Sequence, residues 1–415
     1  EEQESSYQSE NPPRYHTRDV AKYLCARDKS TLVLGSATPA VETAWNAEHG
    51  IYHKALLRRR YNRQALPEVL VADLKQEIRA GNAGMVGQVL RTELEENLRR
   101  GEQSILLLNR RGSNRYLLCG ECGHVPECPR CSVALTYHSA NGRLMCHYCG
   151  HSERSSDTCP VCGGIMKHVG TGTQKVEEEL HDLFPGTEVL RMDADTAAGR
   201  HEQLLDKFER EQIPILLGTQ MVAKGLDFED VTLVGVLGID SLLFAQGFRA
   251  YENVFSLITQ VVGRSGRARD PGFAIIQTTD PDNPVLNLAA AQDYDAFFEQ
   301  EIAYRKLGLY PPFCGLCVIG FAGAKEIEVA RAAARFAALL GQQAAKQPDL
   351  PLRVLGPTPG SIEKINDTYR YKLTIKCRND RRFRDLVRST LERYEQEKLP
   401  SKATVAVDLH SDGDI

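Results

Sequence analysis

The sequence predicts an α/β fold built on a parallel sheet, interrupted by a cysteine-rich insertion and followed by a separate α+β domain. Three observations indicate this. Apolar strands alternate with amphipathic helices between about residues 31 and 290, as in parallel sheets with right-handed crossovers. Four Cys-x-x-Cys pairs interrupt that alternation between Cys119 and Cys162. From about Asp293 onward the order of elements becomes β-α-β-β-α-β.

The alternating part begins with a short, fully apolar strand expected at Thr31–Gly35. A helix follows at 40–49, where Pro39 suits the first turn and Thr38 suits the cap. The later strands are expected at Val69–Ala72, Ser104–Asn109, Glu188–Met192, Ile213–Gly218 and Thr232–Leu237. The later helices are one that ends near Arg100, one with Val176, Leu180, Leu183 and Phe184 on one face, one through Leu204 and Phe208, and one with Val254, Leu257, Ile258 and Val261 on one face.

The C-terminal domain is expected to contain four strands and two helices. Its elements are a strand at Leu316–Phe321, an alanine-rich helix at Glu326–Ala345, strands at Arg353–Leu355 and Tyr369–Lys376, a helix at Arg381–Gln396 and a last strand at Thr404–Leu409. Arg370 and Lys372 alternate along their strand with Tyr369 and Tyr371, so one set packs and the other meets solvent.

Composition excludes some function classes. No apolar run approaches the ~18 residues of a membrane span, and nothing resembles a signal peptide. The net charge is only -4, so any contact with DNA must come from local basic clusters. Such clusters occur at Arg58–Arg60, at Arg110 and Arg111, at Arg264, Arg267 and Arg269, and at Arg378, Arg381, Arg382 and Arg384. The default interpretation of each cluster is a solvated face.

The four Cys-x-x-Cys pairs predict two structural zinc sites. The pairs are Cys119/Cys122, Cys128/Cys131, Cys146/Cys149 and Cys159/Cys162. Two such knuckles complete one tetrahedral shell, so eight sulfurs supply two closed sites with none left over. Disulfides are the alternative, but short knuckles suit metal better than long-range bridges. A catalytic redox pair is disfavoured, because no strand-CxxC-helix pattern of the thioredoxin kind is present. Cys314-x-x-Cys317 runs into an apolar strand and is interpreted as core.

Three sequence motifs resemble motifs III, V and VI of superfamily 2 helicases. They are Gly35-Ser-Ala-Thr-Pro39, Gly218-Thr-Gln-Met-Val-Ala-Lys-Gly-Leu-Asp-Phe228 and Gln260-Val-Val-Gly-Arg-Ser-Gly-Arg267. Together with the eight cysteines, the motifs make essentially the whole chain similar to the PriA (primosomal protein N prime) family of bacterial replication-restart helicases. The resemblance implies a RecA-like helicase lobe of the P-loop NTPase type, with the zinc-binding region inserted into it.

The resemblance also implies roles for individual residues. Phosphoryl transfer needs a metal-bound triphosphate, a positioned water and positive charge at the transition state. Catalytic roles fall on Glu1, Gln260, Arg264 and Arg267, contacts with ATP and magnesium on Ser36, Thr38, Gly225, Asp227 and Gly263, and DNA contacts on Tyr7, Arg14, Tyr15, Thr219, Lys224, Arg370 and Lys372. Simpler readings remain open: an acidic tail at Glu1, a helix cap at Thr38, partners of a helix dipole at Arg264 and Arg267, and core tyrosines on the strand of Arg370.

Several features depart from the family pattern. The aromatic-rich loop from Tyr7 to His16 has Pro12-Pro13 where an aromatic residue often lies, Gly247 replaces a usual Asp, and the last motif reads GRSGR. A Walker A loop, GxxxxGK[ST], is absent from the 415 residues. The chain is therefore expected to be a C-terminal fragment that hydrolyses no ATP by itself.

The family pattern nests the cysteine pairs. One zinc ion is expected at Cys119, Cys122, Cys159 and Cys162, and the other at Cys128, Cys131, Cys146 and Cys149. The resulting domains are the end of helicase lobe 1 at 1–60, lobe 2 at 61–112 and 168–290, the two-zinc insertion at 113–167, and the C-terminal α+β domain, which binds DNA or partners, at 291–415.

The function that the resemblance implies is that of an ATP-dependent DNA helicase, with 3′ to 5′ polarity, which recognises stalled forks and reloads the replisome. Its partners would be branched and single-stranded DNA, primosome proteins, a helicase loader and single-strand-binding protein. No membrane partner is expected. Its location would be the bacterial cytoplasm, at the nucleoid. Two rivals remain, another superfamily 2 DNA translocase and a zinc-organised interaction platform without catalysis. ATP turnover by a longer protein would separate them.

Overall fold

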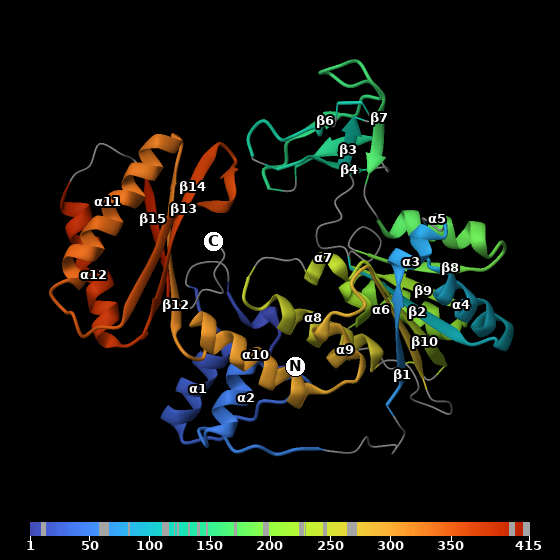
Figure 1. Ribbon diagram of the computed structural model, residues 1–415, viewed down its shortest axis with the longest axis horizontal. Coiled ribbons are helices and arrows are strands. Elements are labelled where there is room, and N and C mark those ends of the chain that lie inside the picture. The colour runs from blue at the N-terminus through green and yellow to red at the C-terminus, as the bar shows by residue number, and fades with distance from the viewer. Residues whose placement is uncertain are drawn as a thin grey trace. The chain divides into compact units, whose positions relative to one another are not determined.

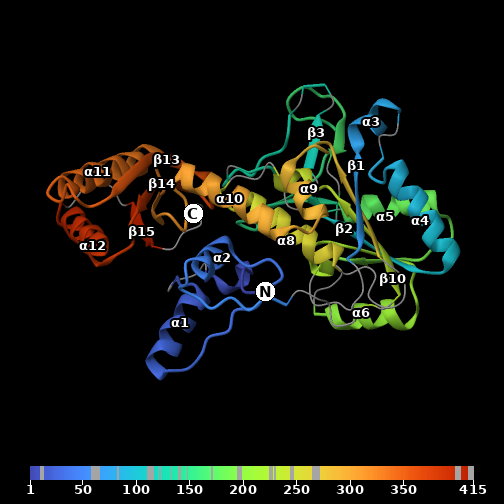
Figure 2. The same ribbon diagram turned by 60° about the horizontal axis from the view of Figure 1, so that its bottom comes forward.

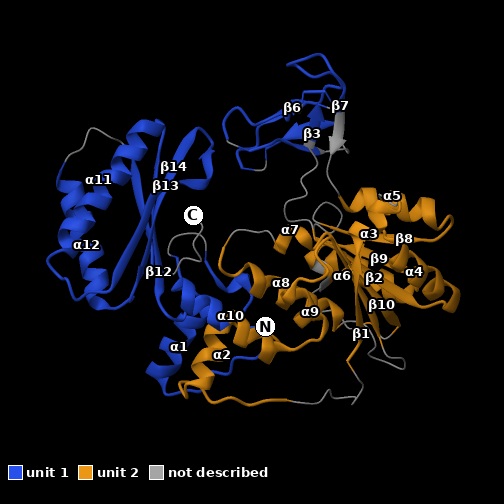
Figure 3. Ribbon diagram, in the orientation of Figure 1, with its two compact units in different colours: residues 1–36, 115–169, 302–415 blue, residues 37–114, 170–301 orange. Residues whose placement is uncertain are grey.

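The structure is a computed structural model of the chain. It describes residues 1–9, 14–57, 66–81, 84–109, 116–119, 121–122, 124–131, 133–138, 142–146, 148–169, 172–193, 199–223, 228, 230–243, 247–263, 272–397 and 403–409. The chain forms two compact units (Figure 3), each assembled from separate stretches of sequence. Unit 1 comprises Glu1–Ser36, Arg115–Val169 and Ile302–Ile415, and unit 2 comprises Ala37–Asn114 and Gly170–Glu301. This division cuts across the four expected domains, whose boundaries stay a prediction.

Unit 2 is built on a six-stranded parallel sheet (Figure 1). In the order in which they pair, its strands are β1 (Glu68–Asp73), β11 (Phe273–Thr278), β10 (Val231–Leu237), β2 (Gln103–Leu108), β9 (Ile215–Gly218) and β8 (Val189–Met192). Every residue of β2 is buried, which is typical of a parallel strand covered on both faces. The predicted parallel sheet is therefore confirmed, together with the strand and helix alternation that indicated it.

Helices cover both faces of this sheet. Those that contact its strands are α3 (Leu74–Arg79), α4 (Gln88–Arg100), α5 (Thr173–Leu183), α6 (His201–Arg210), the 3-10 turn η2 (Gln220–Ala223), α8 (Ala250–Val262) and α9 (Pro284–Ala290). Helix α7 (Asp240–Leu243) contacts α8, and unit 2 also contains α2 (Val41–Glu48). Helix α4 places Leu90 and Leu94 on one face at a spacing of four residues, where they pack with Val176 and Leu180 of α5. It ends at Gly101, whose positive φ of 69° suits glycine.

The prediction of a strand at Thr31–Gly35 is wrong. No described strand pairs with this stretch, and the Val33 side chain is 83% exposed. An apolar run forms a strand only where a neighbouring strand can accept its backbone hydrogen bonds. The following helix is present as α2, but its cap is Ala40 rather than the expected Thr38.

Unit 1 contains a short N-terminal segment and the cysteine-rich region. The N-terminal segment forms a 3-10 turn, η1 (Ser5–Tyr7), and helix α1 (Thr17–Asp28). The cysteine-rich region has two small antiparallel sheets, one of β3 (Tyr116–Cys119) with β7 (Met166–Val169), the other of β4 (Thr136–His138), β5 (Arg143–Met145) and β6 (Ser152–Arg154). Because β3 and β7 pair, the two ends of the insertion lie side by side.

The C-terminal domain of unit 1 has the predicted β-α-β-β-α-β order. After α10 (Tyr294–Gly308), which begins in unit 2, come β12 (Gly315–Gly323), α11 (Glu326–Ala344), β13 (Leu352–Ile365), β14 (Thr368–Cys377), α12 (Arg381–Gln396) and β15 (Thr404–Asp408). The sheet order is β13-β14-β12-β15, with antiparallel pairing throughout. Helices α11 and α12 contact each other (Figure 2) and share a core with Cys317, Phe321 and Ile375. Within the described ranges, none of the helices is long and apolar enough to cross a membrane.

Candidate functional site

All four cysteine knuckles are closed by the same backbone hydrogen bond. In each, the N–H of the first cysteine donates to the carbonyl five residues later. The bonds run from Cys119 to His124 at 2.8 Å, from Cys128 to Val133 at 2.9 Å, from Cys146 to His151 at 2.8 Å and from Cys159 to Gly164 at 2.7 Å. The repeated turn brings the two sulfurs of each pair to the same side, so each pair acts as a two-thiolate unit.

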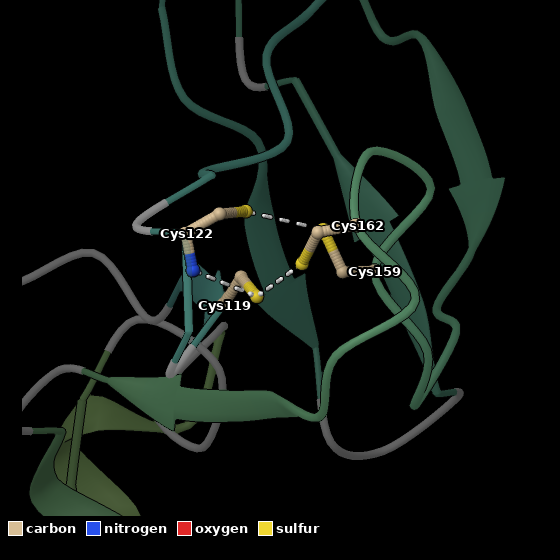
Figure 4. A group of neighbouring side chains, drawn as sticks. All are labelled: Cys119, Cys122, Cys159 and Cys162. Carbon is tan, nitrogen blue, oxygen red and sulfur yellow. Dashed lines mark hydrogen bonds between the residues drawn. The ribbon is translucent and has the colours of Figure 1, made fainter.

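The eight sulfurs form two groups of four. Site 1 is Cys119, Cys122, Cys159 and Cys162, and site 2 is Cys128, Cys131, Cys146 and Cys149; in each, all four ligand atoms lie within 4.8 Å of one another. Figure 4 shows the site 1 side chains converging, and the Sγ atoms of Cys119 and Cys162 are 3.4 Å apart. All eight cysteines are free thiols, so the disulfide alternative is wrong. The nested arrangement is the expected one.

The sulfur spacing fits zinc. A tetrahedral ion with zinc–sulfur bonds of about 2.3 Å holds its sulfurs about 3.8 Å apart. The Cys122 and Cys159 sulfurs are separated by 3.7 Å, and those of Cys128 and Cys149 by 3.6 Å. Each site has four thiol ligands and no open position in its donor set, which is the pattern of a structural rather than a catalytic zinc site.

The thiols of each site have different pKa values. The backbone N–H groups of Cys122 and Glu121 lower the pKa of Cys119 to about 6. In site 2, the His151 N–H lowers the pKa of Cys149 to about 7. Burial instead raises the pKa of Cys131 to about 12. A zinc ion must therefore displace protons from some of its ligands, and those protons are released when it binds.

Two motif residues meet through a third side chain in unit 2. Thr38 is buried, and its Oγ1 lies 3.0 Å from the Ser256 Oγ of α8. The Ser256 hydroxyl also accepts a hydrogen bond of 3.4 Å from Nε2 of Gln260, one turn further along α8. Ser256 thus joins the motif III threonine to the motif VI glutamine. This contact takes the place of the helix-cap role, which the Ala40 cap excludes.

An ion cluster beside this chain was not predicted from the sequence. Glu252 of α8 is buried, and its Oε1 accepts the Val41 N–H at 2.9 Å. Its Oε2 accepts from Arg249 at 2.9 Å, and Arg249 also donates to Glu42 at 2.6 Å and 3.1 Å. One sequence signal could have revealed this cluster: Glu252 lies on the same helical face as the apolar Phe255 and Val262. A buried carboxylate requires a charged or hydrogen-bonding partner.

The remaining residues expected near the nucleotide lie in different places. Glu1 is exposed, whereas its neighbour Glu2 is buried and pairs with Arg18 of α1. Ser36 donates a hydrogen bond of 2.6 Å to the Gln3 side chain. Gly263 caps the C-terminal end of α8. Four expected residues, Gly225, Asp227, Arg264 and Arg267, lie outside the described residues.

The expected DNA-contacting residues are described except for Lys224. Tyr7 and Tyr15 are 44% and 46% exposed, and each directly precedes a member of the antiparallel bridge between Gln8 and His16. Arg14 forms an ion pair of 3.3 Å with Asp408 of β15. Thr219 follows β9 and its carbonyl accepts the Val222 N–H at 3.0 Å.

On β14 the tyrosines face the helices of the C-terminal domain. Tyr369 and Tyr371 pack against the core, and Tyr371 donates a hydrogen bond of 3.2 Å to Glu326 of α11. Because side chains alternate along a strand, the half-buried Arg370 and Lys372 lie on the opposite face of the sheet. The tyrosines are thus partly buried against the core, and the basic pair lies on the other face of the sheet.

Comparison with protein families finds three models that match successive parts of the chain. Residues 128–154 match the PriA DNA helicase Cys-rich region domain, residues 167–269 match the helicase conserved C-terminal domain, and residues 306–411 match the primosomal protein N C-terminal domain. Among solved structures, the chain is similar to S. cerevisiae Dbp5 bound to RNA and ADP BeF3, with 14% identity over 68% of this chain and 58% of that chain and a TM-score of 0.33.

Curated relatives match nearly the whole chain. A replication restart protein PriA of Bacillus subtilis is 41% identical over 99% of this chain and 51% of the relative. Those of Synechocystis and Chlamydia pneumoniae are each 39% identical over 91% of this chain and cover 46% and 51% of the relatives. The chain therefore spans about half the length of the curated relatives it matches. Over that span, the chain belongs to the PriA family of replication restart proteins.

Proposed function

We propose that this chain is part of an ATP-dependent DNA helicase that moves 3′ to 5′, recognises stalled forks and reloads the replisome. The observation that carries the proposal is one arrangement: two four-cysteine sites inserted between β2 and α5 of a parallel helicase sheet, and followed by the C-terminal domain of the same family. The insertion of the cysteine sites at this place argues against another superfamily 2 DNA translocase.

The motor residues have separable roles in this proposal. ATP would supply the phosphoryl group, and magnesium would supply positive charge that holds the phosphates. Arg264 and Arg267 would place positive charge at the phosphates, just after the end of α8 at Gly263. The Thr38–Ser256–Gln260 contacts support a role in holding motif III and motif VI together. Glu1 would position the attacking water, while Ser36, Gly225 and Asp227 would contact the nucleotide.

DNA would be held by exposed rings and by basic side chains. Tyr7 and Tyr15 offer rings on which unpaired bases can stack, and Thr219 and Lys224 would contact backbone phosphates. Arg14, Arg370 and Lys372 would add positive charge. We further propose primosome proteins, a helicase loader and single-strand-binding protein as partners, at the bacterial nucleoid in the cytoplasm. The two zinc ions serve structure, because each ligand set is closed.

A chimaera tests the motor. It joins the preceding half of the Bacillus subtilis relative to this chain, and ATP hydrolysis is measured with and without single-stranded DNA. We expect DNA-stimulated turnover and unwinding of a forked duplex by the chimaera. We expect no turnover by the 415-residue chain, whose sequence lacks GxxxxGK[ST]. A well-folded chimaera without turnover would favour a zinc-organised interaction platform. Robust turnover by the 415-residue chain would contradict the expectation that it hydrolyses no ATP by itself.

A further inference from the structure

The turn between β13 and β14 contacts site 2 of the cysteine-rich region, within unit 1. Ile365 pairs with Thr368, so the turn has two residues, Asn366 and Asp367. Their φ values are 49° and 59°, as the favoured two-residue hairpin turns require. In such a turn the two central N–H groups have no partner inside the hairpin. Here both donate to the second knuckle instead.

One of these N–H groups reaches a metal ligand. Asn366 donates to Cys131 Sγ at 3.1 Å. In the other three knuckles the second cysteine receives an N–H from the residue two positions after it: His124 for Cys122, His151 for Cys149 and Gly164 for Cys162. The equivalent residue for Cys131 is Val133. The C-terminal domain thus supplies to site 2 a contact that the other knuckles provide for themselves.

Further contacts fix the turn around the same knuckle. Asp367 donates its N–H to the Arg130 carbonyl at 2.8 Å, and Arg130 Nε donates back to the Asp367 carboxylate at 2.9 Å. The Arg130 guanidinium also donates to the Asn366 side chain. Lys364 Nζ donates to the Pro129 carbonyl at 3.1 Å, and Ile365 packs against the core of the cysteine-rich region.

We propose that the β13–β14 turn is part of the outer shell of site 2, so that metal at this site and docking of the C-terminal domain on the cysteine-rich region stabilise each other. Hydrogen bonds to a zinc-bound sulfur orient the ligand and help retain the metal. Since such coupling is reciprocal, a metal ion that fixes Cys131 also fixes the acceptor for Asn366. Site 1 has no described contact with this turn and serves as an internal reference. The inference does not depend on ATP hydrolysis.

The first experiment measures metal retention at each site of the 415-residue chain. Zinc-loaded protein is mixed with EDTA, pulsed with N-ethylmaleimide and digested, and mass spectrometry reports alkylation of each cysteine with time. Arg130→Glu and Asp367→Arg each place like charges in contact. We expect either change to speed alkylation of the site 2 cysteines by about tenfold or more. Alkylation of the site 1 cysteines should not change.

The combined variant, Arg130→Glu with Asp367→Arg, separates charge from backbone strain. It keeps an arginine at the positive φ of residue 367 but restores opposite charges, so retention at site 2 should recover toward that of the parent protein. Asp349→Arg is the matched control, because Asp349 forms a similar exposed pair with Arg382 in the same domain, at 2.8 Å and 3.0 Å. Equal loss at both sites, or equal effects of Asp349→Arg and Asp367→Arg, would overturn the proposal.

The second experiment reads the coupling in the other direction. Hydrogen exchange is followed in a peptide that covers residues 364–369, with α11 as the reference for an intact C-terminal domain. Cys149→Ala removes a site 2 ligand that the turn does not contact, and Cys162→Ala removes a ligand of site 1. We expect rapid exchange at the turn in Cys149→Ala and parental protection in Cys162→Ala. Unchanged protection in Cys149→Ala, with α11 still protected, would mean that the turn docks independently of the metal.

Discussion

Glu252 holds together two segments of unit 2 that are far apart in sequence. Its carboxylate accepts from Val41 at the start of α2 and from Arg249 just before α8, and Arg249 reaches on to Glu42. Glu252→Ala would leave the Arg249 charge with one partner fewer and the Val41 N–H without its acceptor. Removing one member of a buried pair costs about 3–5 kcal/mol, so we expect a loss of stability near the lower end of that range, measured by urea unfolding.

Two further variants show whether burial is the cause. Glu252→Gln keeps an acceptor for Val41 and should cost less than Glu252→Ala. Glu188 forms an exposed pair with Lys207 at 3.2 Å, and Glu188→Ala should cost less than about 1 kcal/mol. If Glu188→Ala and Glu252→Ala cost the same, the cluster has no special role in joining α2 to α8.

Which residues could be predicted depends on how local their partners are. The eight cysteines are recognisable because each pair and its turn occupy a few consecutive residues. Thr38 and Glu252 are different: the partner of Thr38 is Ser256, and Glu252 accepts from Val41, each more than 200 residues distant in sequence. A hydroxyl before a helix suits a cap, and only the fold reveals a distant side chain that competes for it.

At the scale of elements, the cysteine-rich region has little core besides its metal ligands. Its described core consists of five of the eight cysteines together with Leu117, Leu135, Leu144 and Met166. Each zinc ion can contribute on the order of 10 kcal/mol of apparent folding free energy. We therefore expect two zinc ions per chain by mass spectrometry under native conditions, and loss of the β3–β7 structure when a chelator removes them.

The unit 2 sheet provides the control for chelation. Its core contains no ligand of either site, so hydrogen exchange in β2 and β10 should keep its protection while the cysteine-rich region loses it. A zinc content near one per chain, or anomalous scattering from ions that join the first two cysteine pairs, would contradict the nested arrangement.

Strand β14 presents a basic face for which a DNA role can be measured. Arg370 and Lys372 lie on the face opposite the core tyrosines. If both neutralise DNA phosphates, affinity for single-stranded DNA falls steeply with salt, and Arg370→Ala with Lys372→Ala should flatten the slope of log affinity against log salt by roughly one to two units. Fluorescence anisotropy of the whole 415-residue chain measures this. Arg381→Ala is the control, since the Arg381 side chain is 92% exposed on α12. If the double change leaves the slope unchanged, this face does not bind DNA phosphates and is available to other partners.

The elements show where pattern alone fails. The helix expected at Arg381–Gln396 is present with those bounds, because its apolar spacing and its Asp380 cap are local. The strand expected at Thr31–Gly35 is absent, because an apolar run does not reveal whether a neighbouring strand exists. Strand β11 and helix α10 fall outside the expected elements, although β11 is apolar and pairs with both β1 and β10. The order of the strands in the sheet thus could not be predicted from the apolar pattern of the sequence.

At the scale of the whole molecule, the chain covers about half the length of its curated relatives, so the proposed contact of its arginines with a nucleotide is tested together with the other residues that the relatives contain. The chimaera with the Bacillus subtilis relative supplies those residues. If Arg267 contacts the transition-state phosphates, Arg267→Ala in the chimaera should lower ATP turnover by about three to five powers of ten. In that case DNA binding should hardly change, because the lost charge would act on the nucleotide and not on DNA. Arg267 lies outside the described residues, so the kinetic measurement is the direct test of its role.

Two comparisons decide whether Arg267 acts chemically or only supports the fold. Arg267→Lys keeps the positive charge but loses the planar, forked donor, so a finger role predicts a large loss of turnover in this variant as well. Gln260→Ala instead removes the contact of 3.4 Å with Ser256 on α8 and should lower turnover by a smaller factor, because it removes no positive charge. Thermal unfolding of each variant is measured alongside. If Arg267→Ala lowers DNA binding and thermal stability as much as it lowers turnover, the arginine packs the lobe and carries no charge to the phosphates.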